Sequence, residues 1–528
     1  MKKSKYLIAI ILIIIFTFSV VPKTFQNDTF YIIELGRGIM ETGVDWKDHY
    51  SIHPSLEYRY PHWAFDVLNS WIYNIAGFDG IYVATQIFAS IFMLLVFWNM
   101  LKKGIGFNLA FISTLVVSYM MKGSFYERGQ IVSYSIFLVE YIVLERFSER
   151  PSLFKTLALI VLSCIMANVH STAWIMMLVL ILPFVGEQIV YAYSLKGVNE
   201  RLLKKYKKKY KKAKNSNKSQ EVLKILEEKI KQQEEFKIKN SQEQKENKII
   251  ITKKTNIKYM WVAVVALIIG SLMTPLKLTP ILYVLKTAIG NSMGYINEHL
   301  PIIPANNLEF FAYSAIIIAM LGFTKSKLKL SDGFLILGLY LMTISGRRNV
   351  FLLIGLTSGI IVKMIDDFIK YNIKEENEKV EKVFYRLICV ASIIVSVYMF
   401  VIKIGKPYVS KELYPVNATE YIKNNLDYKN ARIYNGYDYG SYLLMEGVPV
   451  FLDSRCDLYT PEFNEGVKVF DDYMDVAYGE KTISSLMDKY DLKYAVVRTK
   501  SSEQTYMAED DRYEELYKDK YFIVYKYE

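Results

Sequence analysis

The sequence predicts an α-helical polytopic membrane protein of about eleven spans, followed by a small C-terminal extracytoplasmic α/β domain. Three observations carry this prediction. Of the 528 residues, 52% are hydrophobic, and they gather in blocks instead of the even spacing of a soluble core. Lysine and arginine collect in every second gap between the blocks. After residue 405 the pattern changes to short β-type runs that alternate with helical ones.

The apolar blocks predict the transmembrane helices. The first block follows Lys2, Lys3 and Lys5 and has no small-x-small cleavage site before Pro22, so we expect a signal anchor. A span needs about twenty apolar residues. The expected spans lie near residues 5–21, 79–101, 105–121, 130–146, 154–169, 172–194, 257–273, 308–323, 332–345, 349–366 and 384–403.

Charge sets the expected orientation in a plasma membrane. The gaps at 102–103, 146–150, 196–254, 325–329 and 370–382 are all basic, so the positive-inside rule places them and the N-terminus in the cytoplasm. An odd number of spans then places the C-terminal segment outside.

Two domains follow from this topology. A transmembrane domain covers residues 1–404, with an outer loop at 22–78 and a cytoplasmic insert at 195–256. The insert has the pattern of two charged helices joined by a polar turn, which is typical of a solvated helical hairpin. Residues 405–528 form the extracytoplasmic domain. Its expected strands are 431–436, 448–453, 494–498 and 521–525, and its expected helices are 418–425 and 483–490.

Cysteine usage and net charge exclude two classes of function. Cys164 and Cys389 lie inside apolar runs and Cys456 stands alone, which gives neither a disulfide framework nor a zinc-binding CxxC pair. The formal net charge of +12 comes from lysines between spans, where anionic membrane lipids account for it. We therefore expect membrane lipids as partners and no nucleic acid.

Residues useful for chemistry gather on the expected outer side. All five histidines fall there: His49, His53, His62, His170 and His299. The outer loop also contains Asp28, Asp45 and Asp48.

Asp28 directly follows the first span, at the border of hydrocarbon and water, which suits a general base for an acceptor hydroxyl. An alternative is an N-cap for a helix over residues 29–40. The two roles do not exclude each other.

Arginines on the outer side run against the positive-inside bias and so indicate a function or an acidic partner. Arg347 and Arg348, followed by Asn349, lie between two spans, and Arg128 opens another. Arginine binds phosphate oxygens with two parallel hydrogen bonds, so this set can hold an anionic lipid phosphate. The alternatives are ordinary headgroup binding or salt bridges to Glu127 or Glu298.

At this point the sequence resembles the GT-C superfamily of membrane glycosyltransferases, which includes protein mannosyltransferases, aminoarabinose lipid A transferases and oligosaccharyltransferases. The resemblance rests on an acidic residue after the first span in a large outer loop, on an amphipathic stretch at 61–76, and on a C-terminal exterior domain. The matching segments are Asn27-Asp28-Thr29-Phe30, Arg128-Gly129-Gln130, 167–170, Asn297-Glu298-His299, Arg347-Arg348-Asn349, 434–444 and 450–459. The piece Tyr437-Asp438-Tyr439-Gly440 is similar to an oligosaccharyltransferase motif but lacks its two tryptophans, so we do not expect sequon recognition.

The resemblance implies an inverting transfer of a sugar from a polyprenyl-phosphate-linked donor to an extracytoplasmic glycan, lipid or protein of the cell envelope. It implies Asp28 as the base, with Glu298 and His170 beside it, and the arginines and Asn349 on the donor phosphate. Acceptor or accessory roles fall to Asp45, Asp48, His62, Gln130, Asp453 and Arg455. Asp453 and Arg455 also fit a structural ion pair.

Some features stay open. Asp28, Asp45, Asp48, Glu298 and His170 include the donor types of a divalent cation site, but their spacing specifies no geometry, so no cofactor is certain. The oligomeric state is also open. Alternative functions are a transporter or flippase of lipid-linked envelope precursors, or a non-catalytic scaffold. Transporters place charges near the bilayer midplane in repeated halves, whereas here the charges cluster at one face.

Overall fold

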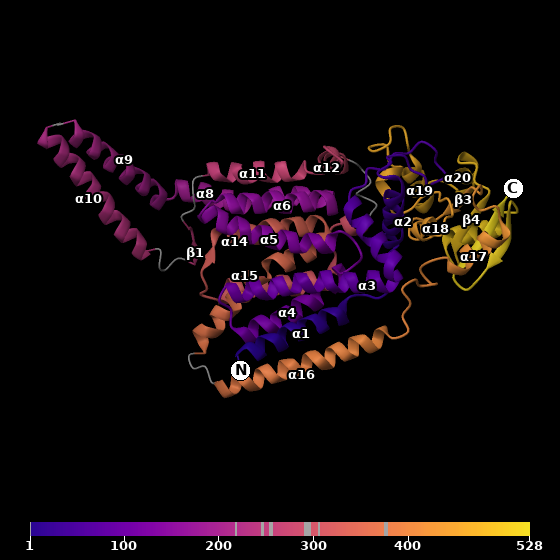
Figure 1. Cartoon of the computed structure of the whole chain (residues 1–528), viewed down its shortest axis with the longest axis horizontal. Coiled ribbons are helices and arrows are strands. Elements are labelled where there is room, and N and C mark those ends of the chain that lie inside the picture. Colours follow the sequence, from indigo (N-terminus) through magenta and orange to yellow (C-terminus); the bar gives the residue numbers. More distant parts are fainter. Residues whose placement is uncertain are drawn as a thin grey trace.

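The computed structural model describes residues 2–216, 219–243, 248–252, 257–289, 297–304, 307–373 and 378–528. Long helices lie side by side along one axis and form a bundle (Figure 1). The outer loop and the C-terminal domain lie at one end of this bundle. The N-terminus and a helical hairpin lie at the other end (Figure 1). The arrangement separates the loops that the sequence assigns to opposite membrane sides.

A helix lies at each of the eleven expected spans. The helices of the bundle are α1 (Lys2–Val20), α3 (Trp63–Lys102), α4 (Phe107–Met120), α5 (Gln130–Glu149), α6 (Leu153–Val169), α7 (Trp174–Val179), α8 (Leu182–Tyr193), α11 (Lys258–Ser271), α13 (Leu308–Phe323), α14 (Leu330–Ser345), α15 (Val350–Asn372) and α16 (Glu378–Lys403). The expected span at 172–194 is divided between α7 and α8, with Pro183 near the start of α8.

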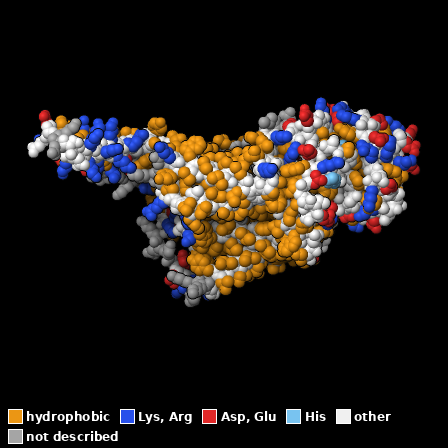
Figure 2. Space-filling view, turned by 45° about the horizontal axis from the view of Figure 1, so that its top comes forward, with side chains coloured by type: hydrophobic (Ala, Val, Ile, Leu, Met, Phe, Trp, Pro, Cys, Tyr) orange, Lys and Arg blue, Asp and Glu red, His pale blue; other side chains and the backbone are white. Residues whose placement is uncertain are grey.

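Three stretches among the described helices are long and apolar enough to cross a membrane: Trp63–Lys102, Ser171–Tyr193 and Glu378–Lys403. Six further apolar helices are shorter. The bundle carries a broad hydrophobic surface between its two charged ends (Figure 2). Large apolar side chains on this surface, such as Phe154 and Phe323, stay exposed, which is the pattern of a protein solvated by lipid. The number of spans and their sidedness remain predictions.

The outer loop is folded tightly onto the bundle. It contains α2 (Asn27–Thr42), and the expected amphipathic stretch at 61–76 is the first part of α3. At Gly77 the backbone takes φ 58° and ψ −150°, a conformation that favours glycine, and the helix changes direction there. α2 and α3 approach closely at Gly36: a Cβ atom at this position would lie only 2.0 Å from the carbonyl oxygen of Asp66, so no larger residue fits without a shift.

The C-terminal domain has a four-stranded sheet in the order β3-β4-β6-β5, with β3 and β4 parallel and the other pairs antiparallel. Its elements are α17 (Val416–Asn425), β3 (Ile433–Asn435), α18 (Gly440–Met445), α19 (Val469–Ala477), α20 (Ile483–Lys489), β4 (Tyr494–Arg498), α21 (Ser502–Glu509), β5 (Tyr513–Lys518) and β6 (Phe522–Tyr527).

One expected strand of this domain is wrong. Residues 448–453 are not a strand of the sheet, because their backbone partner is the outer loop. The Val450 amide donates to the Tyr50 carbonyl oxygen at 3.1 Å, and the Ile52 amide donates to the Val450 carbonyl oxygen at 2.9 Å. The apolar run is therefore buried at a junction between two parts of the chain. The sequence prediction also missed β5, whose charged residues hide its strand pattern.

The insert forms the expected hairpin of α9 (Leu195–Asn215) and α10 (Gln220–Glu243), and residues 217–218 of its turn lie outside the described residues. Beyond it, β1 (Ile249–Ile250) pairs in parallel with β2 (Leu328–Lys329). The remaining short elements are η1 (Lys122–Ser124), η2 (Ser171–Ala173), α12 (Thr279–Ile289), η4 (Asn297–His299), η6 (Arg347–Asn349) and η7 (Cys456–Tyr459).

Candidate active site

A cavity of about 790 Å³ lies where the bundle, the outer loop and the C-terminal domain meet. Segments far apart in the sequence form its walls. They include the start of α2, the loop before α5, η4, η6, and residues 437–438 and 454–457 of the C-terminal domain. Nine of the predicted site residues line it: Asp28, His62, Arg128, Gln130, His170, Glu298, Arg348, Asn349 and Arg455. The size is in the usual range for a ligand pocket.

Asp28 lies in the first turn of α2, and the N-cap of this helix is Gln26. The alternative prediction that Asp28 caps the helix is therefore wrong: the helix begins two residues earlier than the apolar pattern indicated. A carboxylate in the first turn is stabilised by the partial positive charge of the helix N-terminus. Its Oδ2 forms an ion pair with Arg128 Nε at 2.9 Å.

Arg128 connects Asp28 to a second carboxylate, because its Nη1 donates to Glu298 Oε1 at 2.8 Å. Burial lowers the pKa of the guanidinium, but the charges of Asp28 and Glu298 outweigh burial and raise it. Burial likewise opposes the ionised form of Glu298, and the attraction of Arg128 outweighs burial and lowers its pKa. Arg128 and Glu298 are therefore both ionised at neutral pH. Arg128 retains further N–H groups for a third anion.

Both arginines of η6 border a cavity, but only Arg348 borders the large one. Arg348 and Asn349 line the large cavity, and Arg348 Nη1 lies 3.2 Å from His299 Nε2. Burial and the Arg348 charge lower the pKa of His299 to about 4, so this ring is neutral at pH 7 and accepts from the guanidinium. Arg347 instead lines a second cavity of about 360 Å³. Arg128, Gln130, Glu298 and Arg348 border both cavities.

The pKa values of His170 and His62 are shifted in opposite directions. Burial, with the neighbouring His62 and arginines, lowers the pKa of His170 to about 3, so this ring stays neutral. Its Nδ1 lies 2.8 Å from Ser133 Oγ. Burial also lowers the pKa of His62, but the Asp66 carboxylate 2.5 Å from Nδ1 outweighs burial and raises it. His62 Nε2 lies 3.2 Å from the Tyr31 hydroxyl.

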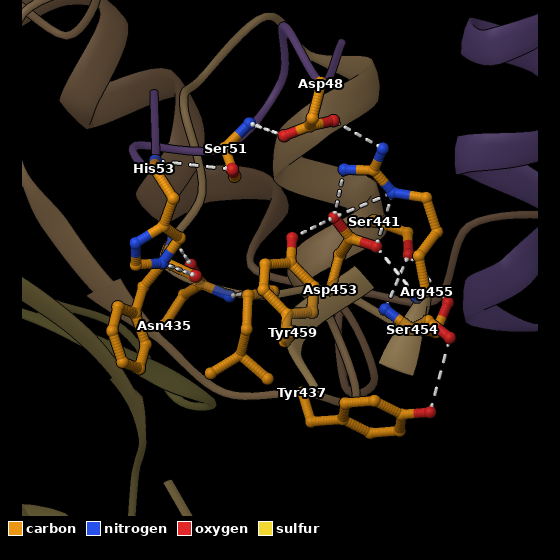
Figure 3. Close-up of polar contacts among 12 residues, drawn as sticks. Asp48, Ser51, His53, Asn435, Tyr437, Ser441, Asp453, Ser454, Arg455 and Tyr459 are labelled. Atoms are coloured by element: carbon orange, nitrogen blue, oxygen red, sulfur yellow. Dashed lines mark hydrogen bonds and ion pairs between the residues drawn. The ribbon is translucent and has the colours of Figure 1, made fainter. Parts of the chain in front are cut away.

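Asp48, Asp453 and Arg455 form a fully buried ion network (Figure 3). Arg455 Nη1 contacts Asp48 Oδ1 at 2.6 Å, and Arg455 Nη2 contacts Asp453 Oδ2 at 2.7 Å. Tyr459 donates to the same Asp453 oxygen at 2.7 Å. Of the three charged residues, Arg455 alone also borders the large cavity. Asp45 lies apart, in an exposed pair with His49.

We expect Arg455→Ala to destabilise the protein by about 3–5 kcal/mol, because it leaves two buried carboxylates without their cation. The control is Arg512→Ala, which breaks the more exposed pair with Asp510 and should lower the free energy of unfolding far less, because solvent screens this pair. The free energy of unfolding, measured in detergent for both variants, checks this. Equal losses in the two variants would contradict a structural role for the network.

Asp66 was not among the predicted site residues, whereas Asp438 and Asp457 lie in segments that carry the resemblance described above. Asp66 could have been found from its spacing of four residues from His62, which places both on one helix face. Asp438 and Asp457 line the large cavity from the C-terminal domain, and the Tyr283 hydroxyl donates to Asp457. Burial, with the nearby Glu462, raises the pKa of Asp457 to about 7. No local pattern marks the contact between Tyr283 and Asp457, since it joins segments 174 residues apart.

Glu127, which the sequence offers as a salt-bridge partner of the arginines, is buried beside the first turn of α2. Its Oε2 accepts from Thr29 Oγ1 at 3.3 Å, and its Oε1 has no partner among the described residues. Burial raises the pKa of this carboxyl from 4.5 to about 8. The folded protein therefore holds a proton here at neutral pH.

Protonation of Glu127 predicts how stability depends on pH. Between the unfolded pKa near 4.5 and the folded pKa near 8, the folded state binds a proton that the unfolded chain releases, so stability falls as pH rises through this window. The slope contributed by this group approaches roughly 1.4 kcal/mol per pH unit. Glu127→Gln should flatten the slope, whereas Glu514→Gln, on an exposed strand, should not. Thermal unfolding midpoints of both variants across this window check the prediction, and identical slopes would contradict it.

Metal ligation is not supported by a local cluster. Among the residues that the structure describes, no group of three or more His, Cys, Asp or Glu side chains is arranged to hold a metal ion. Of the five donors named above, Asp45 and Asp48 do not line the cavity that contains Asp28, Glu298 and His170.

Comparison with known proteins concerns the fold. No family model and no curated protein sequence matches the chain. Its structure is similar to the Archaeoglobus fulgidus oligosaccharyltransferase tethered with an NVT-sequon acceptor peptide, with 10% identity, a TM-score of 0.56, and coverage of 95% of this chain and 70% of that one. The apo form gives 12% identity, a TM-score of 0.53, and coverage of 96% and 70%. ArnT from Cupriavidus metallidurans bound to undecaprenyl phosphate gives 9% identity, a TM-score of 0.47, and coverage of 99% and 97%. At these identities the similarity shows a shared fold, which is the fold that the sequence resemblance implied.

Proposed function

We propose that this chain is an integral-membrane glycosyltransferase that moves a sugar from a polyprenyl-phosphate-linked donor to an extracytoplasmic acceptor, with Asp28 as the base. The observation that carries the proposal is the large cavity. It combines a carboxylate at a helix N-terminus with two arginines, Arg128 and Arg348, at one end of a lipid-facing helical bundle.

The reaction needs an acid–base group and an anion site close together. The acceptor hydroxyl attacks the anomeric carbon of the sugar, the bond from that carbon to the phosphate oxygen breaks, and the polyprenyl phosphate leaves with the electron pair. The hydroxyl proton passes to Asp28. Arg128 and Arg348 neutralise the charge that develops on the leaving phosphate.

The neutral side chains complete the proposed site. His170 and His299 carry no positive charge at pH 7 because their pKa values are about 3 and 4, so they serve as hydrogen-bonding groups for a sugar. Asn349 and Gln130 add amide donors and acceptors to the same wall. The C-terminal domain contributes Asp438 and Asp457 to the lining of the same cavity, and in this proposal they contact the acceptor. A polar wall of this kind suits hydroxyl-rich ligands.

The test is sugar transfer in membranes that contain the chain. Undecaprenyl-phosphate sugars labelled in the sugar are supplied as a panel, and label is followed into glycan, lipid and protein fractions. Transfer from one donor, above membranes without the chain, is the expected result and identifies the sugar. If label crosses the membrane on an intact lipid-linked precursor and reaches no acceptor, the chain is a transporter and the proposal fails.

A further inference from the structure

The hairpin α9–α10 lies at the opposite end of the bundle from the candidate site and has no role in the proposed reaction (Figure 1). Its two helices differ sharply in charge. α9 contains nine lysines and one arginine against one glutamate, a formal net charge of +9. α10 contains five lysines against six glutamates, a net charge of −1. α10 therefore cannot neutralise its partner helix.

Contacts between the two helices fix which face of α9 is free. Asn199 Nδ2 donates to the Gln233 carbonyl oxygen at 2.9 Å near the base, and Lys207 pairs with Glu234 at 2.7 Å. Ala213 is buried near the tip. These positions share one side of the helix by its 3.6-residue period. The opposite side presents the exposed lysines Lys204, Lys208, Lys211 and Lys212.

The hairpin is held at its base by α8. α9 starts directly after α8 ends, and Ser194 caps it by accepting from the Gly197 amide at 3.1 Å. Where the chain returns, Thr252 donates to Glu187 Oε1 from its amide at 2.9 Å and from its hydroxyl at 2.8 Å. In Figure 1 the hairpin leans toward the side on which α11 lies, and α9 is the helix on that side. Figure 2 shows lysine and arginine side chains along it.

We propose that the outer face of α9 binds the anionic headgroups of the leaflet at this end of the bundle. A cluster of lysines next to a transmembrane helix is attracted to an anionic lipid surface within a Debye length. α8 supplies the adjoining apolar helix, and the lean of the hairpin brings α9 toward the lipid around α11. The tyrosines of α9 support lipid over single-stranded nucleic acid. Tyr210 donates to Glu227 and Tyr206 lies under Lys229, so neither forms a free stacking platform.

Lysine accessibility in the full-length protein tests this directly. The protein is placed in nanodiscs of phosphatidylcholine alone or of phosphatidylcholine mixed with phosphatidylglycerol. It is labelled with a water-soluble amine reagent, and the modified lysines are located by mass spectrometry. We expect Lys204, Lys208 and Lys211 to react on the order of tenfold more slowly with the anionic lipid present, and Lys224, Lys231 and Lys237 of α10 to be unchanged. Added salt should remove the protection. Equal reactivity of α9 in both lipids overturns the proposal.

A matched pair of variants separates lipid binding from hairpin folding. Lys204, Lys208 and Lys211 are replaced by glutamine in one variant, and Lys224, Lys231 and Lys237 in the other. Both changes remove three charges, and glutamine has the helix propensity of lysine. Phosphatidylglycerol retained over phosphatidylcholine is then measured by native mass spectrometry. We expect a severalfold loss of preference in the α9 variant only. Equal retention in both variants contradicts the proposal. This is also the result expected if the partner of α9 is an acidic protein and not lipid.

Discussion

Asp28→Asn should lower the kcat of sugar transfer by about 10²–10⁴-fold, the usual contribution of a general base. Asparagine keeps the shape of the side chain at the second position of α2 but accepts no proton. It also gives up the charge that pairs with Arg128 at 2.9 Å. The measurement is initial-rate transfer from the preferred donor, at matched protein abundance.

The control for this loss is Asp491→Asn, the same chemical change on the surface of the C-terminal domain. Asp491 pairs with Lys493, and its side chain is 69% exposed. Its backbone φ of 50° is tolerated by asparagine as well as by aspartate. Activity should be unchanged in this variant. Transfer that survives in Asp28→Asn at the wild-type rate would exclude Asp28 as the base.

Arg128→Gln has the second-largest expected effect, a loss of about 10²–10³-fold in kcat with little change in the KM of the acceptor. This side chain touches both Asp28 and Glu298 and borders both cavities, so it is the residue best placed to meet a leaving phosphate. Arg128→Lys keeps the charge but not the planar fork, and should recover part of the rate.

A double variant distinguishes phosphate binding from simple charge compensation. If Arg128 only neutralises Glu298, then Arg128→Gln combined with Glu298→Gln should restore transfer, because the neutral amides replace the ion pair. If Arg128 stabilises the leaving phosphate, the double variant should stay as inactive as Arg128→Gln alone. Thermal stability of each variant, measured in the same detergent, separates a loss of fold from a loss of chemistry.

The arrangement also bears on the alternative of a transporter. The charged side chains of the large cavity, including Asp28, Arg128 and Arg348, lie at the bundle end that meets the outer loop and the C-terminal domain. A site near the midplane of the bundle would be expected of many transporters. The position of the cavity therefore favours chemistry at one face, and the transfer assay decides between the two.

The sequence by itself determined the helices, because their signal is local. Runs of about twenty apolar residues and the basic gaps between them are readable without any tertiary contact, and each of the eleven expected ranges holds a helix. The hairpin was likewise predictable from charge and period. Candidate residues such as Asp28 and Arg128 stood out because a charge beside an apolar run is unusual.

Only the tertiary structure decided which of these candidates meet. Asp28, Arg128 and Glu298 come together across 270 residues of sequence, whereas of the adjacent Arg347 and Arg348 only Arg348 borders the large cavity. The ion pair of Asp453 with Arg455 was one of the expected alternatives, but the addition of Asp48 and the pairing of Val450 with Ser51 were hidden. Contacts between the outer loop and the C-terminal domain have no local sequence pattern. Local periodicity reports which side of an element is apolar; long-range packing, which sets burial and charge pairing, has no local signature.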